Sequence, residues 1–103
     1  MTIENSVRKL IETAGMTIKL RGTSMLPVLK MGDLVRIEKV MNGFKIGDIV
    51  LFYANGEFIL HRIVYIYGDY IITKGDHNQY LDTPMKSHRI LGVAVEFSGR
   101  QLK

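Results

Sequence analysis

The chain has 103 residues, 47% of them hydrophobic and 23% charged, which is enough for one globular domain and too apolar for a disordered segment. The absence of cysteine excludes disulfides, thiolate zinc sites and cysteine catalysis. The formal net charge is +4, but the basic residues are scattered and no nucleic-acid-binding signature accompanies them, so we expect no nucleic-acid partner.

Residues 3–14 carry the period of an amphipathic helix. Apolar side chains recur at i, i+3, i+4 and i+7, namely Val7, Leu10, Ile11 and Ala14. Gly15 follows where a C-terminal cap is expected. We expect this helix to cover one end of a sheet. No second helix follows it, which excludes helix-turn-helix recognition of DNA.

No apolar stretch of the sequence is long enough to cross a membrane as a helix. The longest runs, around 49–53 and 63–67, are far shorter than the about 20 residues that a spanning helix needs. Residues 1–15 carry charged side chains in place of the apolar segment of a signal peptide. We therefore expect a soluble, cytoplasmic protein, with peripheral membrane association as an alternative.

The rest of the chain reads as short strands separated by turns. Apolar and polar residues alternate strictly over 16–21, and the continuous apolar run of 49–52 predicts a strand buried on both faces. Asn55-Gly56 is the strongest hairpin signal, and Gly68-Asp69 is a second two-residue turn. The remaining strands are expected within the ranges 35–38, 57–67, 70–73 and about 89–97.

About six strands behind one helix predict a mainly β fold, a small curled antiparallel β-barrel or sandwich, closed or partly open. The chain is expected to form a single domain, 1–103, with an N-terminal helix in 1–15 and a β-domain in 16–103. Residues 75–88 form the longest stretch without a predicted element, and long loops in compact domains tend to carry function.

Three stretches contain the residue types of an activated serine nucleophile. In 22–27, Gly22 permits close backbone approach and Pro27 interrupts regular structure, so a tight turn should present Ser24. His61 lies within an apolar strand, where a histidine is either a core side chain or a general base. Asp76 and Asp82 follow in a loop, where an aspartate can also be a simple turn former. A hydroxyl, an imidazole and a carboxylate together can perform nucleophilic catalysis.

Five stretches, in this order and over residues 20–95, resemble the sequence boxes of the signal peptidase I superfamily, which also includes the self-cleaving SOS-type repressors. They are Ser24-Met25 with Pro27 and Gly32-Asp33, Gly47-Asp48-Ile49-Val50, His61-Arg62-Ile63-Val64, Lys74-Gly75-Asp76-His77-Asn78 with Asp82, and Ile90-Leu91-Gly92. A histidine rather than a lysine at position 61 resembles the archaeal, sporulation-associated and endoplasmic-reticulum branch of signal peptidases.

The resemblance implies a role for each of these positions. Ser24 would attack the scissile carbonyl with His61 as its general base, and the Ser24 backbone N–H would bind the oxyanion. Asp82 would orient the imidazole, with Asp76 as the alternative. Met25 and Leu26, directly behind the nucleophile, would contact the substrate.

The sequence also departs from the signal peptidase pattern. Gly22 stands where signal peptidases often carry a serine, His77 stands where an asparagine is usual, and no stretch of this sequence is expected to form the membrane anchor that signal peptidases carry. A membrane or membrane-protein partner would have to dock on exposed apolar residues such as Met25, Leu26, Phe44 and Ile46.

The hypothesis is a soluble serine endopeptidase that cleaves a specific peptide or precursor protein through Ser24, His61 and an aspartate. Two alternatives stay open: a non-catalytic module that binds extended peptides by strand addition, and a regulator that cleaves itself or a repressor. The spacing of His61, His77, His88 and Asp76 matches no compact ligand motif, so we expect no metal or other cofactor.

Overall fold

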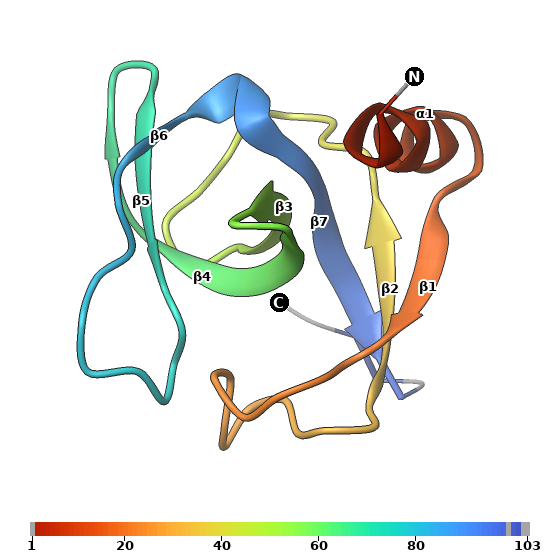
Figure 1. The fold of residues 1–103 in the computed structure, drawn as a ribbon, viewed down its shortest axis with the longest axis horizontal. Coiled ribbons are helices and arrows are strands. Elements are labelled where there is room, and N and C mark those ends of the chain that lie inside the picture. The colour runs from red at the N-terminus through yellow and green to blue at the C-terminus, as the bar shows by residue number, and fades with distance from the viewer. Residues whose placement is uncertain (1, 99, 102–103) are drawn as a thin grey trace.

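The computed structural model describes residues 2–98 and 100–101, and in them one helix precedes a set of short strands (Figure 1). Helix α1 spans Ile3–Ala14, and a short 3-10 helix spans Ser87–Arg89. The strands are β1 (Met16–Lys19), β2 (Leu34–Glu38), β3 (Ile49–Ala54), β4 (Glu57–Tyr67), β5 (Tyr70–Lys74), β6 (Met85–Lys86), β7 (Ile90–Phe97) and β8 (Arg100–Gln101). The prediction of a mainly β fold with one N-terminal helix is confirmed.

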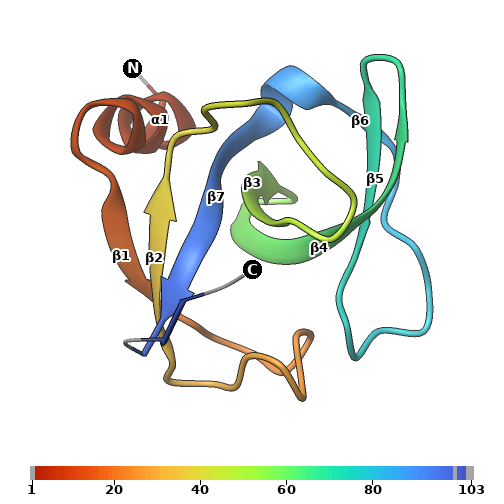
Figure 2. The ribbon, with the colours of Figure 1, turned by 180° about the vertical axis from the view of Figure 1, so that it is seen from behind.

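The strands form one antiparallel sheet in the order β1-β2-β7-β3-β4-β5-β6, with β8 paired to β7. Seen from either side, the sheet curls so that β1 and β2 lie at one flank and β5 and β6 at the other (Figures 1 and 2). Within the described residues β1 and β6 do not pair with each other, so the sheet is curled but not closed. The partly open form of the predicted fold is therefore the one observed.

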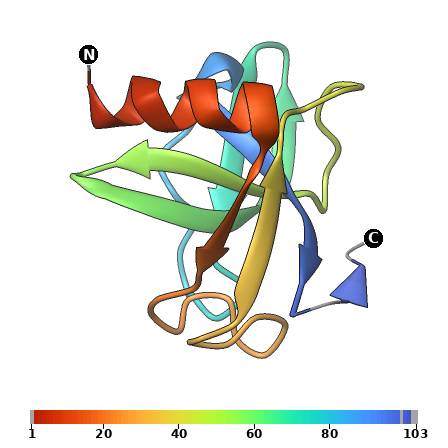
Figure 3. The same ribbon diagram turned by 90° about the vertical axis from the view of Figure 1, so that its right-hand side faces the viewer.

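Helix α1 is capped at both ends and lies across one end of the sheet (Figure 3). The Thr2 hydroxyl accepts a hydrogen bond from the Asn5 N–H, and the Gly15 N–H donates to carbonyl oxygens of the last turn. The helix packs against β2 and β7 through Ile11, which is 1% exposed. Leu10 is 46% exposed, so the apolar stripe expected from the sequence is only partly buried.

Strand β3 divides the interior into two hydrophobic clusters. Ile49 and Leu51 pack with the residues beneath α1, β1 and β2, whereas Val50 and Phe52 pack with residues of β4, β5 and β7. All four side chains are buried, as the continuous apolar run predicted. The central strand therefore holds both halves of the curled sheet together.

Two tight turns bound β4, a strand of eleven residues. Asn55 and Gly56 have φ angles of 53° and 79°, the positive values that a two-residue type I′ hairpin requires. The hairpin register places Val50 opposite His61, and the Gly68-Asp69 turn returns the chain from β4 into β5. Both turns predicted from the sequence are present.

Two irregular segments lie next to each other at the end of the sheet away from α1 (Figure 1). One joins β1 to β2 and carries Ser24, and the other joins β5 to β6 and carries Asp76 and Asp82. The first is the longer, which corrects the expectation that 75–88 is the longest irregular stretch, because β6 and the 3-10 helix occupy part of that range.

Candidate active site

Ser24 lies in a loop whose two ends are joined by backbone hydrogen bonds. The Leu20 N–H donates to the Asp33 carbonyl at 2.8 Å, and the Gly32 N–H donates to the Leu20 carbonyl at 2.9 Å. Gly22 has a φ angle of +81°, which residues with a side chain rarely adopt, so glycine allows the chain to turn just before Ser24. The turn leaves the Ser24 side chain half-buried and facing β4.

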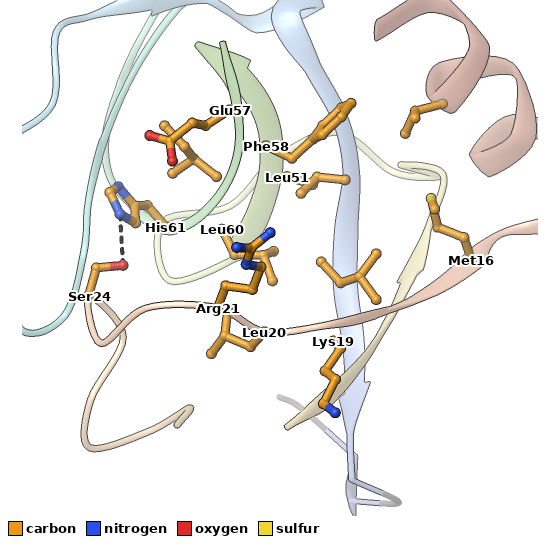
Figure 4. Close-up of a pocket in the computed structure, with 13 residues that line it drawn as sticks. Met16, Lys19, Leu20, Arg21, Ser24, Leu51, Glu57, Phe58, Leu60 and His61 are labelled. Carbon is orange, nitrogen blue, oxygen red and sulfur yellow. Dashed lines mark hydrogen bonds between the residues drawn. The ribbon is translucent and has the colours of Figure 1, made fainter. Parts of the chain in front are cut away.

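The Ser24 hydroxyl contacts the His61 imidazole. Ser24 Oγ is 3.1 Å from His61 Nε2, within the reach expected of a nucleophile and its base (Figure 4). His61 is 7% exposed, and the ring of Phe52 meets it edge-on with centroids 6.1 Å apart. Because His61 sits in the middle of a paired strand, the ring is held in place by its neighbours rather than by a mobile loop.

A carboxylate lies behind the imidazole. Asp82 Oδ2 is 2.6 Å from His61 Nδ1 and accepts a second hydrogen bond, also 2.6 Å long, from the hydroxyl of Thr73. A carboxylate only accepts hydrogen bonds, so His61 Nδ1 carries a proton. In the neutral ring Nε2 is then an acceptor, and it faces the hydroxyl of Ser24. The order of atoms matches a serine nucleophile, its base and an orienting acid.

Asp76 binds Arg62 instead of His61. Arg62 donates to Asp76 from Nε at 2.9 Å and from Nη2 at 2.8 Å, and its Nη1 donates to the Gly47 carbonyl at 2.8 Å. The hydrogen bond to Asp76 and that carboxylate's charge raise the pKa of Arg62, against the lowering effect of burial. In the structure Asp76 therefore does not contact the imidazole, because its carboxylate is bound by the guanidinium of Arg62.

The segment around Asp76 also holds the Ser24 loop. The His77 N–H donates to the Ser24 carbonyl at 2.7 Å, and the Asp76 N–H points at Met25 Sδ from 3.4 Å. A Cβ atom on Gly75 would lie 2.8 Å from the Ser24 carbonyl oxygen, so the two loops touch through bare backbone. The Arg62–Asp76 pair therefore anchors the loop against which the nucleophile rests.

Residues 4–95 match the family model described as Peptidase S24-like. The chain belongs to this family. Its members lie in the superfamily of serine peptidases that contains the signal peptidases and the SOS-type repressors, in agreement with the resemblance seen in the sequence. No curated protein shows significant similarity to the chain.

Two contributions to this S24-like site did not stand out in the sequence. Thr73 is fully buried and donates to Asp82, and His77 acts through its backbone N–H rather than through its exposed side chain. The signal for Thr73 was present, because a hydroxyl at an inward-facing position of a strand requires a hydrogen-bond partner. A backbone contact such as that of His77 leaves no trace in side-chain identity.

Met25 and Leu26, expected to contact the substrate, do not line the groove that contains Ser24 and His61. Met25 is 1% exposed and belongs to the core cluster of Leu29 and Leu51, because its side chain anchors the Ser24 turn. Leu26 is half-buried and does not line the groove at Ser24. Met25 also provides no docking surface for a membrane partner, whereas Ile46 is 64% exposed.

The Ser24 hydroxyl and the His61 ring open into a groove of about 490 Å³ (Figure 4). One wall is β1 with the residues that follow it, and the other is the β3–β4 hairpin. Within the part of the chain that the structure describes, the Ser24 backbone N–H has no hydrogen-bond acceptor. No group of three or more metal-ligating side chains occurs among these residues, and none of their helices is long and apolar enough to cross a membrane.

Proposed function

We propose that this S24-like protein is a serine endopeptidase that cleaves a specific peptide or precursor protein. The observation that carries the proposal is the continuous contact from Ser24 Oγ through His61 to Asp82, with heavy-atom distances of 3.1 and 2.6 Å. Membership of a family of serine peptidases and repressor-like relatives supports the same chemistry.

The geometry supports the following steps. His61 Nε2 takes the hydroxyl proton as Ser24 Oγ attacks the scissile carbonyl carbon, and the tetrahedral intermediate forms. Asp82 stabilises the imidazolium through Nδ1–H while Thr73 holds the carboxylate in place. The imidazolium then protonates the leaving amine as the C–N bond breaks, and a water molecule, activated by the same base, releases the acyl group from Ser24.

The oxyanion of the intermediate requires a hydrogen-bond donor near Ser24. The Ser24 N–H suits this role, because no other described group accepts its proton. Gly22 supplies no second hydroxyl there. The contact between the His77 N–H and the Ser24 carbonyl would keep this donor pointing at one position throughout the reaction.

The first test is labelling with a fluorophosphonate, with which Ser24 Oγ would form a bond to phosphorus as fluoride leaves and His61 takes the proton. We expect the intact protein to be labelled and Ser24→Ala not to be. Cleavage of a peptide mixture should fall on the order of 10⁴- to 10⁶-fold in Ser24→Ala or His61→Ala, the range seen when members of a triad are removed.

Leu10→Ala serves as the control, because this side chain is exposed on α1 and lines no part of the groove. It should be labelled and should cleave like the intact protein. A folded intact protein that neither reacts with the probe nor cuts any peptide, yet still binds peptides, would contradict the proposal and favour a non-catalytic peptide-binding module.

A further inference from the structure

A second pocket, with a volume of about 570 Å³, lies between the β3–β4 hairpin and residues 81–85. Residues 52–55 and Ile59 line it from the hairpin. Ser24 and His61 line the groove described above but not this pocket, and among the described residues the two hollows share Ile59 alone. The volume is within the range of specific ligand sites, roughly 300–1,000 Å³. Occupancy of the pocket therefore leaves the groove at Ser24 free.

One oxygen of the Asp82 carboxylate has no partner within the protein. Oδ2 accepts both side-chain hydrogen bonds of Asp82, from His61 Nδ1 and from the hydroxyl of Thr73. Among the described residues no group donates to Oδ1, while the Asp82 side chain is 27% exposed and lines the pocket. Hydrogen bonds between a carboxylate and a charged donor are among the strong ones. The pocket therefore offers an acceptor for a cationic group.

Apolar side chains lie beside this acceptor. Phe52 and Met85 line the pocket from one hydrophobic cluster, and Phe52 is only 5% exposed. Leu81 also lines the pocket and is 60% exposed, so an apolar ligand would cover surface that the protein leaves open. The ring of Phe52 meets that of His61 edge-on, which brings the pocket within one side chain of the proposed base.

The charge of Arg89, the other ionised side chain that lines the pocket, is balanced within the protein. Arg89 Nη2 donates to the Tyr53 carbonyl at 3.0 Å, and Nε lies 3.9 Å from a carboxylate oxygen of Glu4. Asp82 has no cationic partner before the reaction, because His61 must be neutral to act as a base. The uncompensated charge at the pocket is therefore negative.

We propose that this pocket is a regulatory site for ligands that carry an ammonium group on an apolar body, such as arylalkyl amines. The ammonium group would donate to Asp82 Oδ1, and the apolar body would pack on Phe52 and Leu81. A cation at Oδ1 competes for the carboxylate charge that stabilises the imidazolium, so the bound ligand slows cleavage without entering the groove. The regulation rests on the proposed peptidase function, whereas the binding does not.

The first experiment measures binding without catalysis. Phenethylamine and its neutral analogue phenethyl alcohol are titrated into the isotope-labelled intact protein, and the backbone N–H signals are followed by NMR. The amine should shift the signals of Phe52, Leu81 and Asp82 and bind at least about tenfold more tightly than the alcohol, since a hydrogen bond to a charged group contributes that much. In Asp82→Asn this difference should disappear. Equal affinities of the two probes for the intact protein would overturn the proposal.

A second pair of variants tests the apolar part of the pocket and leaves Asp82 in place. Leu81→Ala should weaken amine binding about fourfold, the contribution of about one covered methylene group. Tyr80→Ala is the matched control, because this side chain is 78% exposed in the same loop and does not line the pocket. It should bind the amine like the intact protein. Equal affinities of the two variants for the amine would contradict the assignment of the pocket.

Kinetics test the regulation. Saturating phenethylamine should lower kcat at least about tenfold, a rise of about 1.4 kcal/mol in the barrier, and leave KM unchanged, while the alcohol should change neither. A rise in KM at constant kcat would place the amine in the groove at Ser24. That outcome, or an unchanged kcat, would overturn the inference and leave the peptidase standing. Amine binding that depends on Asp82, in a protein that neither cleaves peptides nor reacts with the fluorophosphonate, would keep the binding site and contradict the proposed function.

Discussion

Asp82 and Asp76 lie in one loop but bind different partners, because His61 and Arg62 are neighbours on a strand. Successive side chains of a strand point to opposite faces, so one loop can meet the imidazole on one side and the guanidinium on the other. The Asp82 N–H donates to the Thr73 carbonyl at 2.9 Å, which seats Asp82 beside β5 and His61. The sequence left the choice between the two aspartates open, because this seating depends on one backbone hydrogen bond.

Replacing Asp82 by asparagine should reduce kcat about 10⁴-fold, as the same change does in a serine protease triad, because the amide no longer stabilises the imidazolium. Steady-state kinetics and thermal unfolding measure activity and stability separately. Unfolding should shift little, since the asparagine keeps the shape of the side chain.

Asp76→Asn is the matched variant in the same loop. It should destabilise the protein by about 1–3 kcal/mol, because Arg62 loses a charged, mostly buried partner, while retaining far more activity than Asp82→Asn. Equal losses of kcat in the two folded variants would contradict the assignment of Asp82.

At the scale of the elements, the sequence predicted well the strands and turns that a local residue pattern marks. It predicted poorly the contacts between loops that depend on a single residue. Alternation located β1 and the continuous apolar run located β3 to within a few residues, and Asn55-Gly56 located the hairpin, because each signal spans several positions or a specific turn geometry. The docking of the Ser24 loop on residues 75–78 had no such signal. It depends on a backbone hydrogen bond from His77 and on the missing side chain of Gly75.

This docking makes Gly75→Ala a specific test. The new methyl group would meet the Ser24 carbonyl oxygen at 2.8 Å and Asn78 Nδ2 at 2.6 Å, and the backbone contact cannot be relieved by rotating a side chain. Ser24 should therefore shift away from His61, and kcat/KM should fall roughly 10²-fold, the cost of a misplacement on the order of 1 Å.

A second variant separates the effect of the clash with Asn78 from the effect of the clash with the Ser24 carbonyl. Gly75→Ala combined with Asn78→Ala removes the side-chain clash and leaves the backbone clash, so activity should stay low. Asn78→Ala alone should cost little. Recovery of full activity in the double variant would show that the contact with the Ser24 loop does not position the nucleophile.

For the whole molecule, the order of elements could be predicted but the closure of the sheet could not. Closure depends on the tilt and register of all strands together, and no local pattern encodes either of them. The observed sheet stays open between β1 and β6, and the groove at Ser24 runs along the unpaired edge of β1. The feature that sequence reasoning could not decide, the open edge of the sheet, therefore lies beside the groove that contains Ser24.

The position of α1 was predicted in outline and differs in detail. The sequence pattern treats Leu10 and Ile11 as equivalent members of one stripe, but Ile11 is buried and Leu10 is half exposed. A Cβ atom on Gly92 would lie 3.0 Å from Ile11 Cγ2, so glycine in β7 allows this one side chain to approach the sheet closely. Because Ile11 approaches the sheet most closely at Gly92, the buried face of the helix is narrower than the apolar stripe in the sequence.

Ile11→Ala should therefore destabilise the protein by about 2–5 kcal/mol, the cost of truncating a large buried side chain, as measured by urea unfolding. Leu10→Ala should change the free energy of unfolding by no more than about 0.5 kcal/mol, because most of the lost surface is already in water. Equal effects would mean that α1 is rotated from the position described. Since Val7 of α1 also lines the groove at Ser24, such a rotation would change that groove and leave the contact between Ser24 and His61 intact.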